Sequence, residues 1–200
     1  MEQDCRFNTG LLHKGTKGGY KNREILPPIS QVTAFEYESM EELERIFAHK
    51  SMGFAYTRIG NPTLAAFEQK INSLEGGVGA ISCSSGMSAI SSGLLALCES
   101  GDEIIAGRGL YGGTIDLFHD LEKLGIHTVF ADVLDKESIE GLATDRTRAV
   151  FGEVISNPAL TVLDIRQAAD AAHKVGVPLI VDSTTATPFI VRPISFGADI

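Results

Sequence analysis

Beyond residue 60, short apolar runs alternate regularly with segments of helical pattern, and this alternation restricts the fold more than any other feature of the sequence. Apolar runs of strand length occupy residues 78–83, 103–106, 127–131, 149–155 and 178–181, and a further run begins at residue 198. Helical segments are predicted between them, at residues 62–74, 85–99, 112–124, 136–143 and 164–175. Apolar strands that alternate with helices form a mostly parallel sheet covered on both faces. We therefore predict an α/β fold.

Capping residues support the predicted helix boundaries. Asn61 stands before Pro62, a pair typical of the N-cap and the first position of a helix. Ser85 has the residue type of a second N-cap. Gly125 and Gly176 directly follow two of the predicted helices, where a left-handed residue usually ends the helix.

The first 55 residues lack this alternation. Residues 16–22 are rich in Gly and Lys, Pro27-Pro28 excludes a helix, and only residues 40–49 carry apolar side chains at helical spacing. We interpret residues 1–55 as an amino-terminal arm with one short helix that makes intersubunit contacts. Residues 56–200 form the main domain in this interpretation.

The composition argues against several classes of protein. A net charge of -9 and a pI near 5.0 disfavour a nucleic-acid partner. The first residues, Met-Glu-Gln-Asp, do not resemble a signal peptide, and no apolar stretch is long enough to span a bilayer. Cys5, Cys83 and Cys98 lack CxxC spacing, and the five histidines show no paired spacing, so neither disulfides nor a metal site is predicted. We expect a cytoplasmic protein without nucleic-acid or membrane partners.

Residues 84–89, between a predicted strand and a predicted helix, form the first candidate binding segment. Ligands of open α/β sheets bind at the carboxyl ends of the strands. The small residues of Ser-Ser-Gly-Met-Ser-Ala let backbone N–H groups approach an anion, and a helix start carries about half a positive charge. A phosphate site and an ordinary serine N-cap both fit this segment.

Asp182 and Tyr111 are two further candidates. Asp182 ends a predicted strand, where a carboxylate can bind a metal, a ribose hydroxyl or a heterocyclic nitrogen, or can simply cap the next turn. Next to a protonated pyridine it would keep both groups ionised. Tyr111 precedes Gly112 and Gly113, so its ring can lie against a flat ligand, although an exposed tyrosine at a helix start fits equally.

Several segments resemble one family. Residues 56–63, Tyr-Thr-Arg-Ile-Gly-Asn-Pro-Thr, are similar to the YTRxxNPT signature of the PLP-dependent (pyridoxal 5'-phosphate-dependent) Cys/Met metabolism, or trans-sulfuration, enzymes. The resemblance continues through residues 85–87, 110–113, 156–158 and 181–184, in the same order, and covers nearly the whole chain from about Phe7. It implies the large domain of a three-layer PLP-dependent transferase, aspartate aminotransferase-like and of fold type I, in truncated form.

The resemblance also implies roles for residues of the domain itself. Ser85, Gly86 and Met87 would hold the phosphate of pyridoxal 5'-phosphate. Asp182 would pair with the pyridine nitrogen as a catalytic residue. Tyr111 would stack on the ring and assist proton transfer.

Four further positions carry implied roles. Asn157 would hydrogen-bond the phenolic oxygen of the cofactor, and Thr184 would line the pocket. Tyr56 and Arg58 would reach the phosphate of a neighbouring subunit, which implies a homodimer or homotetramer with shared active sites. The forked guanidinium of Arg58 suits a bidentate phosphate contact.

The chain departs from the family pattern in two places. The family has Asp-Asn-Thr and an aromatic residue where this chain has Asp182, Ser183, Thr184 and Thr185, so its packing beneath the cofactor differs. The Schiff-base lysine of the family follows a Gly-Ala-Asp-Ile segment, in a Ser-x-Thr-Lys context, and this chain ends at Ile200. We therefore expect further chain after Ile200 and no turnover by residues 1–200 alone.

Residues 110–114, 162–165 and 178–188 resemble O-acetylhomoserine sulfhydrylases. Methionine γ-lyases are similar too, but typically carry a cysteine where Gly113 stands. The expected activity is γ-replacement on O-acylhomoserine with sulfide or a thiol, a transferase step of methionine biosynthesis that gives homocysteine or methionine. Methionine γ-lyase and cystathionine γ-synthase or γ-lyase are the alternatives within the family. A non-catalytic truncated subunit or dimerisation module is the alternative of another class.

Overall fold

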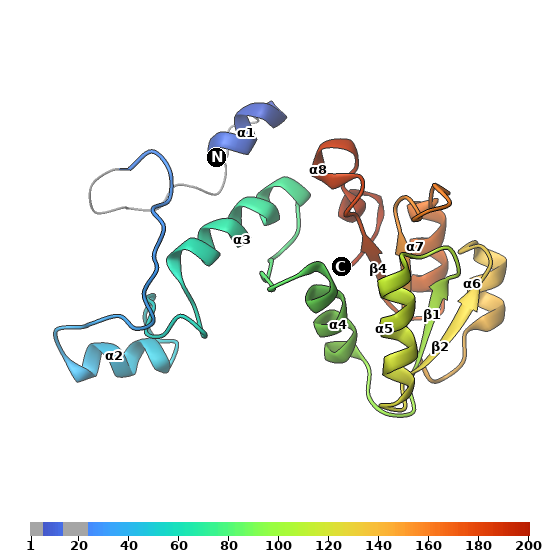
Figure 1. Cartoon of the computed structure of the whole chain (residues 1–200), viewed down its shortest axis with the longest axis horizontal. Coiled ribbons are helices and arrows are strands. Elements are labelled where there is room, and N and C mark those ends of the chain that lie inside the picture. Colours follow the sequence, from blue (N-terminus) through green and yellow to red (C-terminus); the bar gives the residue numbers. More distant parts are fainter. Residues whose placement is uncertain (1–5, 14–23) are drawn as a thin grey trace. The chain divides into compact units, whose positions relative to one another are not determined.

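The computed structural model describes residues 6–13 and 24–200. The chain divides into two compact units, Met1–Ser82 and Cys83–Ile200 (Figure 1). Residues 16–22, noted above for their Gly and Lys content, lie outside the described residues. The division into an arm of residues 1–55 and a domain of residues 56–200 stays a prediction.

The first unit contains three helices in its described part: α1 (Phe7–His13), α2 (Met40–Phe47) and α3 (Pro62–Glu75). Both predicted helices are confirmed, and Asn61 caps α3 by accepting a hydrogen bond from the Thr63 N–H at 2.9 Å. Helix α1 was not predicted, because its sequence includes Asn8, Thr9 and Gly10, which all have low helix propensity.

Little apolar surface is buried in the described part of this first unit. Ile46 and Leu74 are its buried hydrophobic residues, whereas Ile25, Ile29 and Met52 are almost fully exposed. The strand predicted at residues 78–83 is absent, and this prediction was wrong. A parallel strand needs a hydrogen-bonded neighbour, which periodicity alone cannot supply.

The second unit is an α/β domain with a parallel sheet, as predicted, and its four strands have the order β2-β1-β3-β4. Its strands are β1 (Glu103–Gly107), β2 (His127–Ala131), β3 (Thr147–Glu153) and β4 (Leu179–Asp182). Its helices are α4 (Gly86–Leu97), α5 (Gly112–Glu122), α6 (Lys136–Leu142), α7 (Ile165–Lys174), α8 (Thr187–Ile190) and the 3-10 helix η1 (Pro193–Phe196). Residues 198–200 run beside β4 but do not form a regular strand. Backbone hydrogen bonds join them to β4, including one from the Val181 N–H to the Ile200 carbonyl at 2.9 Å.

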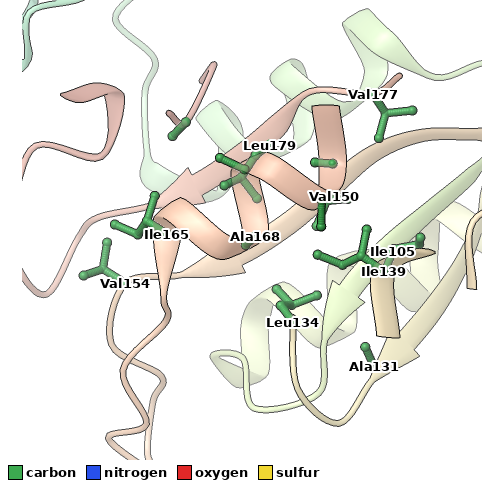
Figure 2. Close-up of a cluster of buried hydrophobic side chains, with 14 of the residues drawn as sticks. Ile105, Ala131, Leu134, Ile139, Val150, Val154, Ile165, Ala168, Val177 and Leu179 are labelled. Atoms are coloured by element: carbon green, nitrogen blue, oxygen red, sulfur yellow. The ribbon is translucent and has the colours of Figure 1, made fainter. Parts of the chain in front are cut away.

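Helices cover both faces of the sheet and bury two clusters (Figure 1). On one face, Phe118 of α5 packs edge-on against Phe151 of β3, with ring centroids 5.4 Å apart. On the other face, Ala168 of α7 packs with Val150 and Leu179 (Figure 2). Among the described residues, no helix is long and apolar enough to cross a membrane.

The register of the sheet determines which side chains can share a site. Glu153 and Asp182 are paired across β3 and β4, so their Cα atoms are direct neighbours. Side chains alternate along a strand, and Phe151 and Ile180 belong to the cluster beneath α4 and α5. Glu153 and Asp182, each two residues further on, therefore point to that same face at the carboxyl end of the sheet.

Candidate functional site

A cavity of about 320 Å³ lies at the carboxyl ends of β3 and β4, entirely within the second unit. It is mostly apolar, and its size falls within the range of small-molecule sites. Seven of the nine predicted site residues line it: Ser85, Gly86, Met87, Tyr111, Asn157, Asp182 and Thr184. The structure therefore brings together residues from four separate segments of the sequence.

The amino end of α4 forms one wall. Ser85 is the N-cap, and its Oγ accepts a hydrogen bond from the Ser88 N–H at 3.0 Å. The first N–H groups of a helix have no acceptor within the helix. Those of Gly86 and Met87 remain for an anion, which the helix dipole also favours. The ordinary N-cap and the anion site are thus compatible.

Asp182, at the end of β4, also lines the cavity. Its Oδ1 accepts hydrogen bonds from the Thr184 N–H at 2.8 Å and the Thr184 Oγ at 2.5 Å. It therefore does cap the next turn, as the simpler interpretation held. Both of these bonds use Oδ1, which leaves Oδ2 for a ligand in the cavity.

Tyr111 is half-exposed at the start of α5, and Gly113 gives its ring room. A Cβ atom built on Gly113 would lie 2.6 Å from Cε1 of the Tyr111 ring. A Cβ atom on Gly112 would meet nothing within 4 Å. Any side chain at position 113 must therefore displace the ring, whereas position 112 tolerates one.

The two unusual positions beside Asp182 have different surroundings. Thr185 lines the cavity, and its Oγ lies 3.5 Å from the Ile155 carbonyl oxygen. Ser183 holds a buried hydroxyl with no hydrogen-bond partner among the described residues. No aromatic side chain occupies either position.

Glu153 is a cavity residue that the sequence interpretation missed. It is buried, and its Oε1 accepts a hydrogen bond from the Tyr111 N–H at 2.7 Å. The pKa of Glu153 is raised above its ordinary value, chiefly by burial and further by the charge of Asp182. The hydrogen bond from the Tyr111 N–H opposes this shift. The one available sequence signal was a carboxylate within the apolar run of residues 149–155, four residues before Asn157.

Thr114 provides a test of whether this cavity suits a polar ligand. It is fully buried at the cavity wall, and its hydroxyl has no hydrogen-bond partner among the described residues. An unsatisfied buried hydroxyl costs free energy that a ligand can recover. Across residues 6–13 and 24–200, no three His, Cys, Asp or Glu side chains gather as metal ligands.

Tyr56 and Arg58 lie in the first unit, outside the residues that line the cavity. The Arg58 guanidinium carbon is 5.7 Å from the centroid of the Tyr56 ring, a cation–π arrangement. Tyr56 also forms an antiparallel bridge with Ala34. The two side chains are therefore held close together, and their predicted reach to a neighbouring subunit stays a prediction.

The fold and the cavity define a class of protein. In this class a parallel α/β domain lines one small-ligand cavity with three groups: a helix start that can bind an anion, a carboxylate, and an aromatic ring. Such a set of groups fits a phosphorylated heterocyclic cofactor. The family model for "Cys/Met metabolism PLP-dependent enzyme" matches residues 8–200, and the chain belongs to this family.

Named relatives agree with that assignment. An O-acetyl-L-homoserine sulfhydrylase of Corynebacterium glutamicum is 42% identical over 97% of this chain and 45% of its own length. An L-methionine gamma-lyase of Porphyromonas gingivalis is 41% identical over 100% of this chain and 51% of its own length. The chain spans about half the length of the curated relatives it matches.

A solved structure supports the fold as well. It is a Campylobacter jejuni protein described as an O-acetylhomoserine (thiol)-lyase, with N'-pyridoxyl-lysine-5'-monophosphate in the chain. The TM-score is 0.91 at 33% identity, over 98% of this chain and 48% of that one. The fold class predicted from the sequence, a large domain of the PLP-dependent transferase type, is confirmed.

Proposed function

We propose that the cavity of the second unit binds pyridoxal 5'-phosphate. The observation that carries the proposal is that the start of α4 and the Asp182 side chain line one cavity. Gly86 and Met87 would donate hydrogen bonds from their backbone N–H groups to the phosphate. Ser85, as the N-cap residue of α4, would lie beside the phosphate at the helix start. A phosphate oxygen gains both hydrogen bonds and the helix dipole there.

The other cavity residues would orient the ring. Asp182 would hold a proton on the pyridine nitrogen through an ion pair. Tyr111 would cover one face of the ring, Asn157 would donate to its phenolic oxygen, and Thr184 would fix Asp182. When bound, the cofactor supplies an electron sink for carbanion chemistry at an amino acid.

For the whole protein we propose γ-replacement on an O-acylhomoserine. The acyl group leaves the γ-carbon as a carboxylate, and a sulfide or thiol forms the new carbon–sulfur bond, which gives homocysteine or methionine. Sulfhydrylases among the relatives support this reaction, and so does Gly113, because methionine γ-lyases typically carry cysteine there. Methionine γ-lyase is the second candidate, supported by relatives of similar identity.

A substrate panel tests the reaction. The whole protein is supplied in turn with O-acetylhomoserine plus sulfide, cystathionine and methionine, and the products are separated and identified. The proposal expects homocysteine and acetate from the first mixture, at a kcat/KM well above that for the other two substrates. Release of methanethiol from methionine as the dominant reaction would favour the lyase. No turnover in any mixture would favour a non-catalytic subunit.

We also propose that the whole protein works in the cytoplasm as a homodimer or homotetramer with shared sites. The described part of the first unit exposes large apolar side chains while burying few, so it has apolar surface to offer to another subunit. The family resemblance assigns Tyr56 and Arg58 to a neighbour's phosphate. Cys83 and Cys98 are free thiols, which is usual in a reducing compartment.

Changing Arg58 to Ala tests the shared site. We expect cofactor affinity to fall by roughly 10- to 150-fold, because a hydrogen bond to a charged group contributes about 1.5–3 kcal/mol. Mixing this variant with Asp182→Asn subunits should restore about a quarter of wild-type activity, since half of the dimers then hold one intact site. The control is Arg166→Ala, whose guanidinium lies over Phe196 in the second unit. A mixture as inactive as its components would contradict the proposal.

Changing Gly113 to Ala tests the position of the Tyr111 ring. The new Cβ would overlap the ring edge, so the ring must move. Because an aromatic stacking contact contributes about 0.5–1.5 kcal/mol, cofactor affinity should fall by about 2- to 10-fold. Gly112→Ala is the matched control and should bind as wild type does. Equal affinities for both variants in a fluorescence titration would show that the ring makes no contact with the cofactor.

A further inference from the structure

Glu153 is a buried carboxylate that the proposed function leaves without a role. Its Oε1 accepts a hydrogen bond from the Tyr111 N–H at 2.7 Å, and the backbone N–H of Asn157 lowers the pKa of this carboxylate to a smaller degree. One side chain thus interacts with the segments that carry two of the proposed cofactor contacts. Tyr111 comes from the start of α5 and Asn157 from the loop after β3, 46 residues apart in the sequence.

This carboxylate accepts the backbone N–H of the residue at the amino end of helix α5. Tyr111 is the N-cap residue of α5, and its own side chain makes no capping hydrogen bond. The first turn closes on the Tyr111 carbonyl, which accepts from the Thr114 N–H at 2.9 Å and the Ile115 N–H at 3.1 Å. A negative charge beside the start of a helix is stabilised by the helix dipole. Glu153 therefore fixes the backbone of the residue whose ring faces the cavity.

This arrangement is costly for a purely structural element. Glu153 is buried and is the register partner of Asp182 on the neighbouring strand, and the charge of Asp182 raises the pKa of Glu153. A buried carboxylate with a second carboxylate as its neighbour at a cavity wall is typical of functional sites.

We infer that Glu153 is a positioning residue that sets the Tyr111 ring over the cofactor by holding its backbone N–H. The inference rests on the proposed cofactor site and deepens it. Glu153 acts through Tyr111 and, to a smaller degree, through Asn157. Removing the carboxylate should therefore weaken ring contacts while leaving the phosphate contacts of α4 in place.

The test uses the apo form of the whole protein and pyridoxine 5'-phosphate, a probe that lacks an aldehyde and binds without a covalent bond. Glu153→Met keeps the side-chain volume and removes the acceptor. It should weaken the probe about tenfold, or about 1.4 kcal/mol. Glu153→Gln keeps one acceptor oxygen and should bind the probe more tightly than Glu153→Met. If Glu153→Met does not fold, Glu153→Gln carries the comparison and should weaken the probe about threefold.

Two further variants separate positioning from general stability. In a Tyr111→Ala background, Glu153→Met should reduce probe affinity by about threefold or less, because only the interaction of Glu153 with Asn157 remains. Glu103→Met is the matched control, since Glu103 is also buried but lies at the opposite end of the sheet, where the Thr144 hydroxyl donates to it at 2.6 Å. This control should lower stability and leave probe affinity unchanged.

The possible failures are distinguishable. If the wild-type protein does not bind the probe, the proposed cofactor site itself is wrong. If the wild type binds and the Glu153 variants bind equally well, Glu153 has no positioning role. An undiminished tenfold effect in the Tyr111→Ala background would show that Glu153 acts on the site by another route, which also overturns the inference.

Discussion

Replacing Asp182 with asparagine is expected to reduce the activity of the whole protein by about 10²- to 10⁴-fold while the cofactor stays bound. Removing one partner of a buried ion pair costs about 3–5 kcal/mol, and each 1.36 kcal/mol corresponds to a factor of ten in rate. Asparagine keeps the shape and the acceptor oxygen for Thr184 but cannot hold a proton on the ring nitrogen. Steady-state kinetics and absorbance of the bound cofactor give the two readouts.

Asp132→Asn is the matched control for this variant. Asp132 directly follows β2, as Asp182 ends β4, but it is highly exposed, pairs with Arg108 at 2.7 Å and does not line the cavity. An exposed ion pair contributes little. The control should therefore retain activity close to wild type. Normal turnover by Asp182→Asn would rule out its role at the ring nitrogen.

Replacing Phe151 with alanine is expected to lower the free energy of unfolding by about 3–5 kcal/mol. Phe151 is fully buried in the centre of the sheet and packs edge-on against Phe118. Its removal leaves a cavity that the helices above the sheet cannot fill without moving. This loss is a large fraction of the stability of a typical domain.

Urea denaturation followed by circular dichroism measures this loss. Phe189→Ala makes the same chemical change at a side chain that is 69% exposed, and it should shift stability by no more than about 0.5 kcal/mol. If both variants unfolded at the same urea concentration, the packing of α5 against Phe151 of β3 would be incorrect.

Local signals were sufficient to predict most of the second unit. Gly125 and Gly176 both adopt a left-handed backbone after α5 and α7, as their positions suggested. The start of β3 was placed two residues late, because Thr147 and Arg148 are polar although they belong to the strand. Strand order was not predictable, since hydrogen-bonded neighbours are chosen by packing across the whole domain.

The candidate site shows the same division between local and tertiary information. Ser85, Asp182 and Tyr111 each carried a local motif, and all three line one cavity. Glu153 carried none, because its importance comes from the β3–β4 register and from the distant Tyr111 N–H. The close approach of the Tyr111 ring to Gly113 could be found only from the structure, because a pair of glycines in a sequence does not reveal which ring lies beside it.

A crystal structure of the whole protein with pyridoxal 5'-phosphate would test the central claim most directly. We expect phosphate oxygens within about 2.7–3.2 Å of the backbone nitrogens of Gly86 and Met87. The ring nitrogen should lie at a similar distance from the Asp182 carboxylate. A phosphate bound away from the start of α4, or an Asp182 side chain turned out of the cavity, would contradict the account.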